Sequence, residues 1–96
     1  MKDRLYLIDL YDLYGDLLTE KQQNYFEDYY FSNLSLSEIA ENVDVSRNAV
    51  HNQIKDVEEK LLYYEAHLHL HERNSKIKEL LVSLDANMQH KIEELL

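Results

Sequence analysis

Five polar side chains between positions 47 and 55 have the types and spacing that suit chemistry on another molecule. At 100° per residue of an α-helix, all five fall within about 140° of the helix circumference. Arg pairs with guanine and Asn with adenine in the DNA major groove, while Lys holds phosphates. The pattern predicts a face that contacts nucleic acid, made of Arg47, Asn48, His51, Asn52 and Lys55.

Three further residues are candidates for phosphate contacts. Ser46 immediately precedes the helix that carries the five side chains, and Thr19 precedes an earlier helix that contains Lys21. The first N–H groups of a helix have no partner within it, so they bind anions readily. We expect Ser46, Thr19 and Lys21 to meet backbone phosphates.

Three histidines, His67, His69 and His71, alternate near the end of the same predicted helix. The i, i+4 pair His67 and His71 has a spacing that can grip a metal. A closed zinc site wants four ligands, and the chain has no Cys, so a solvated or interfacial histidine face is the favoured interpretation. An inter-subunit site that also uses Glu65 or Glu72 is the alternative.

No motif joins Ser, His and carboxylates into a catalytic set, and no phosphate-binding Gly-rich loop occurs. We therefore expect neither an enzyme nor a cofactor.

The elements that must position these residues follow from caps and apolar spacing. Residues 1–18 predict an N-terminal helix over 4–14, with Gly15 as a left-handed stop. Residues 19–62 predict a helix to about Phe31, then a helix-turn-helix: Ser37 caps a short helix over 38–43, and Ser46 caps the next. Ala40 is small enough for a close crossing of the two helices, and Asp44 tolerates the left-handed turn. The apolar residues expected to seal them are Ile39, Val43, Val45, Val50 and Ile54.

The remaining residues, 63–96, predict a C-terminal helical dimerisation segment. The second helix of the motif is expected to run on toward Arg73, with a break at Asn74-Ser75 and a further start at Ser83 or Asp85. Two long apolar stripes in so small a chain would be exposed in a monomer, which favours a homodimer. The expected interface residues are Leu61, Tyr64, Leu68, Ile77, Leu81, Leu84 and Met88.

The net negative charge of the chain argues against strong, sequence-independent binding of nucleic acid. The chain has 10 Lys and Arg against 19 Asp and Glu, a formal net charge of −9. Nucleic-acid binding gains affinity when Lys and Arg replace the counterions of phosphates. Within Thr19–Leu62, four basic residues stand against nine acidic ones. Any groove contact therefore depends on a narrow strip from Arg47 to Lys55.

Composition indicates an all-α protein: the 96 residues contain no Pro and one Gly, which hairpins and tight turns would need. The absence of Cys fits a reducing compartment. We see no signal peptide and no apolar run of the roughly 18 residues that a membrane span needs. A cytoplasmic location is expected.

The stretch LTEKQQNYFEDYYFSNLSLSEIAENVDVSRNAVHNQIKDVEEKL resembles region 4 of bacterial sigma-70-type factors. With its Tyr-rich flanks, the whole chain is similar to the small YlxM family of Gram-positive bacteria. That resemblance implies a sigma-70 region 4-like helix-turn-helix fold with flanking helices and a homodimer held by the C-terminal helices. It also implies a link to the signal recognition particle pathway.

Together these observations predict a regulatory helix-turn-helix protein that binds nucleic acid as a homodimer, with DNA favoured over RNA. The alternative is an adaptor that uses the same fold on a protein. For that role the family resemblance points to the signal recognition particle GTPase.

Overall fold

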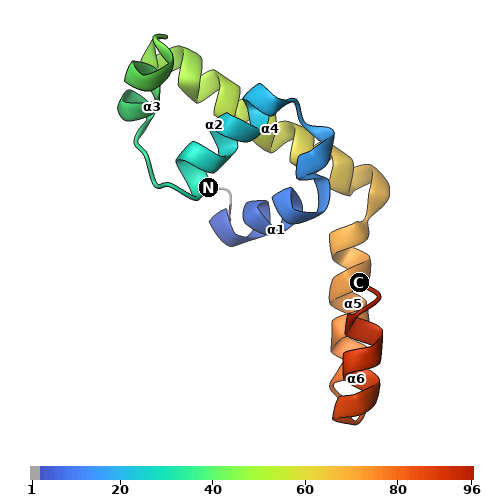
Figure 1. Cartoon of the computed structure of the whole chain (residues 1–96). Coiled ribbons are helices and arrows are strands. Elements are labelled where there is room, and N and C mark those ends of the chain that lie inside the picture. Colours follow the sequence, from blue (N-terminus) through green and yellow to red (C-terminus); the bar gives the residue numbers. More distant parts are fainter. Residues whose placement is uncertain (1–2) are drawn as a thin grey trace.

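The computed structural model describes residues 3–96, and over those residues every regular element is a helix (Figure 1). The predicted all-α fold is confirmed. Residues 1–2 of the predicted N-terminal segment lie outside the described residues. The elements are α1 (Arg4–Tyr14), the 3₁₀ turn η1 (Gly15–Leu17), α2 (Glu20–Tyr30), α3 (Leu36–Val43), α4 (Arg47–Leu68), α5 (Leu70–Leu81) and α6 (Ala86–Glu93).

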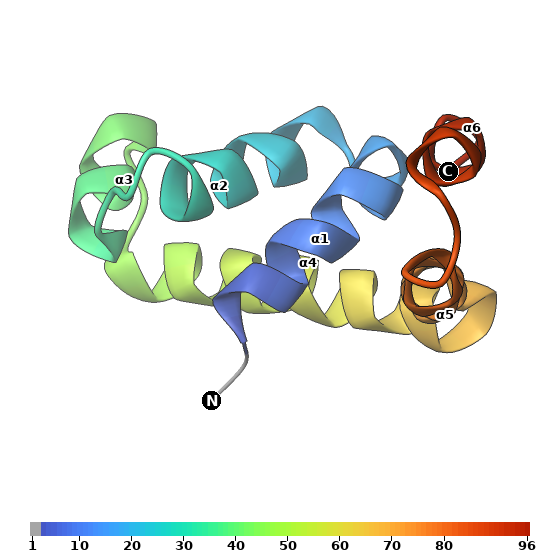
Figure 2. The ribbon, with the colours of Figure 1, turned by 90° about the horizontal axis from the view of Figure 1, so that it is seen from below.

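The long helix α4 is the element on which α1, α2 and α3 pack. Figure 2 shows it running beneath α2 and α3, with α1 crossing it. Four apolar residues of α4 recur every three or four positions and so share one buried side of the helix: Val50, Ile54, Val57 and Leu61. The core contains Leu7, Leu10, Tyr14, Phe26, Tyr30, Ile39, Val50, Ile54, Val57 and Leu61.

The prediction that α4 continues toward Arg73 is wrong, because the helix ends at Leu68. His69 takes a left-handed conformation, φ 55°, and α5 starts directly after it in a new direction. Asn74 and Ser75, where a break was expected, lie inside α5.

A buried carboxylate holds this joint. Glu65 lies at the end of α4 with 7% of its surface exposed and accepts a 2.6 Å hydrogen bond from the Tyr14 hydroxyl. It also accepts hydrogen bonds from the backbone N–H groups of His71 (3.0 Å) and Glu72 (3.1 Å), which are first-turn donors of α5. The Leu70 N–H donates to the Tyr14 hydroxyl at 3.1 Å. Side chains of α1 and α4 therefore cap α5 from outside that helix.

Helices α5 and α6 form a hairpin that projects away from the other four helices (Figure 1). The Gln89 amide donates to the carbonyls of Leu81 (2.6 Å) and Leu84 (2.9 Å), which ties α6 to the end of α5. Of the two predicted caps, Asp85 is the one used: it accepts from the Met88 N–H at 2.9 Å. The molecule is elongated as a result, with extents of 52 × 25 × 25 Å.

Three local predictions need correction. Gly15 has an ordinary right-handed φ of −56°, and a Cβ there would lie 3.1 Å from the Tyr11 ring, so the position is constrained by space and not by a left-handed turn. Helix α3 starts two residues earlier than expected: Ser35, not Ser37, is its N-cap, in a reciprocal capping box with Glu38.

The third correction concerns the seal of the helix-turn-helix. Ile39, Val50 and Ile54 are buried as predicted, but Val43 and Val45 are 44% and 41% exposed. Ile39 of α3 therefore makes the seal with Val50 and Ile54 of α4, and the two valines next to the turn stay largely outside it.

The joint at Glu65 generates a stability prediction. Burial alone would raise the pKa of Glu65, but the hydrogen bonds from Tyr14, His71 and Glu72 outweigh it, and the pKa is lowered. The stability that the ionised form contributes is present above the unfolded-state pKa of about 4.3 and is lost as pH falls through the folded-state value. We expect Glu65→Gln to reduce the free energy of unfolding at pH 7 by about 1–3 kcal/mol.

Urea unfolding of wild type and Glu65→Gln between pH 7 and pH 3 checks this. The difference between them should shrink in acid, because the wild-type carboxyl is then protonated as well. The exposed Glu59→Gln serves as the control and should change little. A difference that stays constant with pH would show that the ionised carboxylate is not the source of the stability.

Candidate nucleic-acid interface

Helices α3 and α4 form a helix-turn-helix around the turn 44–46. Asp44 is left-handed, φ 56°, as predicted, and the N–H groups of Asp44 and Val45 both donate to the Ala40 carbonyl. Ala40 is 8% exposed, so the small residue expected between the helices is buried. Ser46 caps α4 by accepting from the Ala49 N–H at 3.1 Å. Each end of the turn is thus satisfied by local hydrogen bonds.

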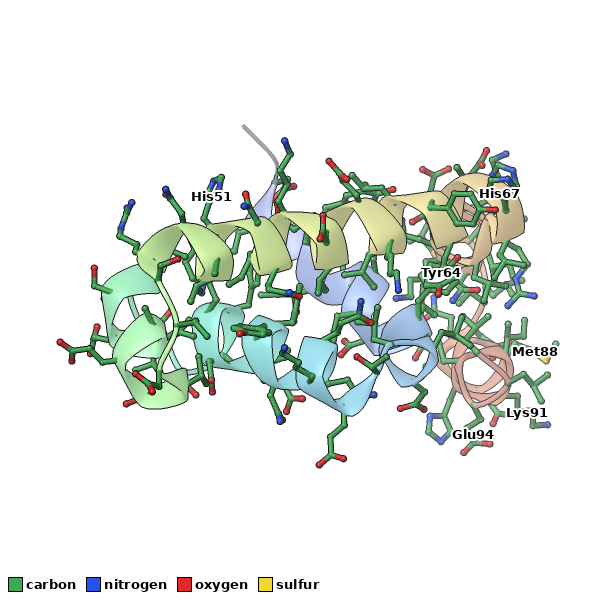
Figure 3. All side chains as sticks on the ribbon, turned by 90° about the horizontal axis from the view of Figure 1, so that it is seen from above. His51, Tyr64, His67, Met88, Lys91 and Glu94 are labelled. Atoms are coloured by element: carbon green, nitrogen blue, oxygen red, sulfur yellow. The ribbon has the colours of Figure 1, made fainter. Side chains whose placement is uncertain are left out.

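The face of α4 beside its buried stripe is open to solvent. All five residues of the predicted contact face, Arg47, Asn48, His51, Asn52 and Lys55, are exposed. Figure 3 shows the labelled His51 pointing away from α2, which lies on the other side of α4. Within residues 3–96, none of the five side chains has a hydrogen bond or ion pair with another side chain. These side chains therefore face the solvent on α4, and none of them stabilises the fold through a side-chain hydrogen bond or ion pair. We call them the recognition face.

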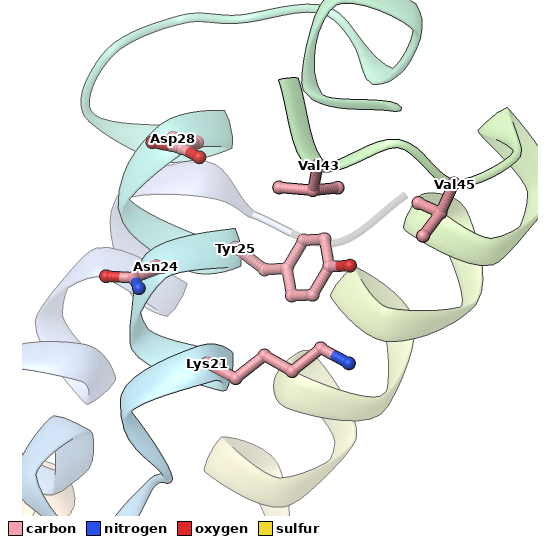
Figure 4. Close-up of a pocket in the computed structure, with 6 residues that line it drawn as sticks. All are labelled: Lys21, Asn24, Tyr25, Asp28, Val43 and Val45. Atoms are coloured by element: carbon pink, nitrogen blue, oxygen red, sulfur yellow. The ribbon is translucent and has the colours of Figure 1, made fainter. Parts of the chain in front are cut away.

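The predicted phosphate residues do not gather in one place. Thr19 caps α2 in a capping box with Gln22, as its predicted cap role requires. Lys21 lies with Tyr25, Val43 and Val45 around a hollow of about 150 Å³ between α2 and the turn (Figure 4). Ser46, in contrast, adjoins the recognition face at the start of α4. Of the three, only Ser46 is next to the five side chains in the chain.

A second and larger hollow, about 600 Å³, adjoins the recognition face. His51 and Lys55 of α4 line it together with Tyr29 of α2, Leu36 of α3 and Arg4 of α1. Sequence reasoning missed Arg4, because it is 43 positions before Arg47 and belongs to no motif. The one available signal is that Arg4 is the single basic residue among the residues of α1.

An acidic group also borders this hollow. Glu58 lies one turn beyond Lys55 and accepts a hydrogen bond from the Tyr30 hydroxyl. Burial and this bond to Glu58 raise the pKa of Tyr30, so its proton stays on the hydroxyl. The carboxylate is thereby held on the α2 side of α4.

The histidine prediction changes with the break at His69. His67 approaches the Tyr63 carbonyl (2.8 Å) within α4, whereas His71, in α5, approaches Asp9 of α1 (3.4 Å). The pair expected on one face of a continuous helix is therefore split between two helices. Within residues 3–96, no group of three His, Cys, Asp or Glu side chains is arranged to hold a metal ion.

The residues predicted for a dimer interface divide into three sets by their exposure. Leu61 is fully buried and Leu81 is 4% exposed, so both are used inside this chain and offer no surface to a second one. Tyr64 and Ile77 are half-buried. Leu68, Leu84 and Met88 are 52%, 39% and 43% exposed, and Met88 points outward from α6 (Figure 3).

Among the described residues, no helix is both long enough and apolar enough to cross a membrane.

The fold and the recognition face define a helix-turn-helix protein. The chain belongs to the UPF0122 family, described as "Putative helix-turn-helix protein, YlxM / p13 like", whose model matches residues 1–95. It is similar to a UPF0122 protein of Ureaplasma urealyticum, 42% identical over 93 residues that cover 96% of this chain and 94% of the relative. A UPF0122 protein of Clostridium kluyveri is 47% identical over 79 residues, 82% of this chain and 71% of the relative.

The cap at the start of α4 generates a prediction. Replacing Ser46 by Ala removes the bond to the Ala49 N–H, so we expect the free energy of unfolding to fall by about 0.5–2 kcal/mol. Ser75→Ala, at an exposed site inside α5, is the matched control and should be neutral or slightly stabilising. Thermal or urea unfolding measures both, and equal effects of the two variants would contradict the cap.

Proposed function

We propose that this protein is a cytoplasmic regulatory protein that binds nucleic acid through the recognition face of α4. The observation that carries the proposal is the exposure of five groove-compatible side chains that make no side-chain hydrogen bond or ion pair within residues 3–96. No hydrogen bond or ion pair to another side chain within residues 3–96 holds them, so they are available to bond to a partner, which then bears the entropy cost of ordering them. Arg and Asn supply the donors and acceptors that base edges match.

The shape of α4 favours DNA over RNA as this partner. A helix fits the major groove of B-form DNA, whereas the major groove of A-form RNA is too deep and narrow for side chains to read. In a helix-turn-helix complex the N-terminal residues of the second helix contact the bases. Arg47 and Asn48 are the first two residues of α4, and His51 and Asn52 follow one turn later.

We further propose that the protein acts as a homodimer joined through its α5–α6 hairpin. This hairpin exposes large apolar side chains, among them Leu80 (72%), Val82 (81%), Leu84 (39%) and Met88 (43%). Four large exposed apolar side chains within residues 80–88 are the material for an apolar patch, and such patches mark interaction sites. A dimer would also provide two recognition faces, which compensates for weak binding by one acidic chain.

A second candidate function is an adaptor on a protein, with the signal recognition particle GTPase as the partner that the family resemblance implies. The charge of the motif favours it: four basic residues stand against nine acidic ones between Thr19 and Leu62. An acidic surface disfavours phosphates and is compatible with a basic protein surface.

The nucleic-acid proposal predicts the behaviour of an Arg47→Ala/Lys55→Ala double variant. We expect it to lose most of the affinity for a pool of 30-base-pair random-sequence duplexes, measured by fluorescence anisotropy at 50 mM salt. Wild-type affinity should fall steeply between 50 and 200 mM salt, because binding releases counterions.

The control is Lys78→Ala/Lys91→Ala, which removes the same charge from exposed sites on α5 and α6. It should keep nearly wild-type affinity. A double variant at 47 and 55 that binds as well as this control would overturn the recognition face and favour the adaptor.

The dimer proposal predicts the mass in solution. We expect a dimer at micromolar concentration by analytical ultracentrifugation, and a monomer for Leu84→Glu/Met88→Glu, because burying two carboxylates in an apolar interface is costly. Leu5→Glu, at a 72% exposed site on α1, is the control and should leave the dimer intact. A wild-type protein that stays monomeric would defeat the proposal.

A further inference from the structure

The hollow of about 600 Å³ beside the recognition face is bordered by two cationic side chains, Arg4 and Lys55, and by the imidazole of His51. Arg4 comes from α1, and His51 and Lys55 come from α4, where they are one turn apart. Arg4, His51 and Lys55 are all exposed. Among the described residues that line this hollow, the one acidic side chain is Glu58, which accepts a hydrogen bond from the Tyr30 hydroxyl. In a chain of net charge −9, this is a local concentration of positive charge.

Arg4 is held in a fixed position at this edge. Its Nη2 donates to the Tyr30 carbonyl (2.6 Å), the Asn33 Oδ1 (2.8 Å) and, more weakly, the Tyr29 carbonyl (3.4 Å). Its guanidinium carbon lies 4.9 Å from the centre of the Tyr30 ring. All three hydrogen bonds use the same nitrogen, and a guanidinium carries five N–H donors in a planar fork. The donors on Nη1 and Nε make no hydrogen bond within the described residues.

We propose that Arg4 and Lys55 bind one backbone phosphodiester of the nucleic acid whose bases the recognition face contacts. This inference rests on the proposed function. In helix-turn-helix complexes the first helix of the motif crosses the sugar-phosphate backbone while the second helix occupies the groove, so phosphates lie beside the second helix. Arg4 of α1 borders that side of α4, where it shares a hollow with Lys55. A pre-positioned guanidinium loses little entropy on binding an oxyanion and matches its geometry in a bidentate pair. The hollow is open to solvent, which suits an anion that keeps part of its hydration, and Arg4 and Lys55 supply positive charge at its border.

This assignment replaces Thr19 and Lys21 as phosphate residues. Those two lie at the start of α2, and Lys21 faces the hollow by the turn, which Arg4, His51 and Lys55 do not line. Arg4 and Lys55 instead share a hollow with His51, a member of the recognition face.

The test compares Arg4→Gln with the charge-conserving Arg4→Lys on the random-sequence duplex pool. We expect Arg4→Gln to flatten the slope of log K against log salt by about 0.9, equivalent to roughly eightfold weaker binding at 0.1 M salt, and Arg4→Lys to keep the slope. The loss should be similar for all duplex sequences, since a phosphate contact carries no sequence information. Arg73→Gln on α5 is the matched control and should leave the slope unchanged.

Because Arg4 also caps the end of α2, the folding of each variant is checked by its thermal melt. A measurement on the wild type decides the matter if Arg4→Gln does not fold: the NMR signal of the Arg4 Nε–H should shift on titration with the duplex pool. An unmoved signal, or an unchanged slope in a folded Arg4→Gln, would overturn the inference while wild-type binding stands. Failure of wild-type protein to bind any duplex would overturn the proposed function itself, and this inference with it.

Discussion

The burial of one stripe on α4 is the interaction on which the rest of this structure depends. Val50, Ile54, Val57 and Leu61 are between 0% and 5% exposed, and they bring α1, α2 and α3 onto a single helix. Removing such side chains from water stabilises a fold by roughly 1.5–3 kcal/mol each as an upper estimate. Because these four residues occupy one side of α4, they also determine which side of the helix remains exposed to solvent. The same four residues therefore determine both how α1, α2 and α3 pack on α4 and which side chains of α4 face the solvent.

The local signals in the sequence predicted much of this arrangement. Thr19, Ser46 and Asp85 cap helices as expected, since an N-cap depends on a side chain and backbone within three residues of each other. The apolar period of α4 and the left-handed Asp44 are equally local. Ser35 and Ser37 were both possible N-caps of α3. Ser35 is the one used, because the side chain of Glu38 bonds back to the Ser35 backbone N–H while the Ser35 hydroxyl accepts from the Glu38 N–H.

The features that sequence reasoning missed depend on residues far apart in the chain. No Gly or Pro marks the end of α4, and His69 is left-handed because Tyr14 and Glu65 satisfy the first N–H groups of α5. Tyr14 is 51 positions before Glu65, so neither residue alone predicts the joint. Arg4 reaches the hollow beside Lys55 in the same way, through the packing of α1 on α4. The candidate site could thus be predicted where α4 alone forms it, but not where α1 completes it.

These distant contacts also relate the two proposed surfaces to each other. Helix α4 carries the recognition face near its start and reaches the α5–α6 hairpin at its end, so the joint at Glu65 sets the angle between them. In the proposed dimer, that angle would fix the separation of the two recognition faces, which duplex DNA requires to match whole turns of about 34 Å. A buried carboxylate bonded to three donors is stiff, because breaking any bond leaves a poorly solvated charge. The acidic residue least accessible to nucleic acid is therefore the one that most constrains how the protein would hold it.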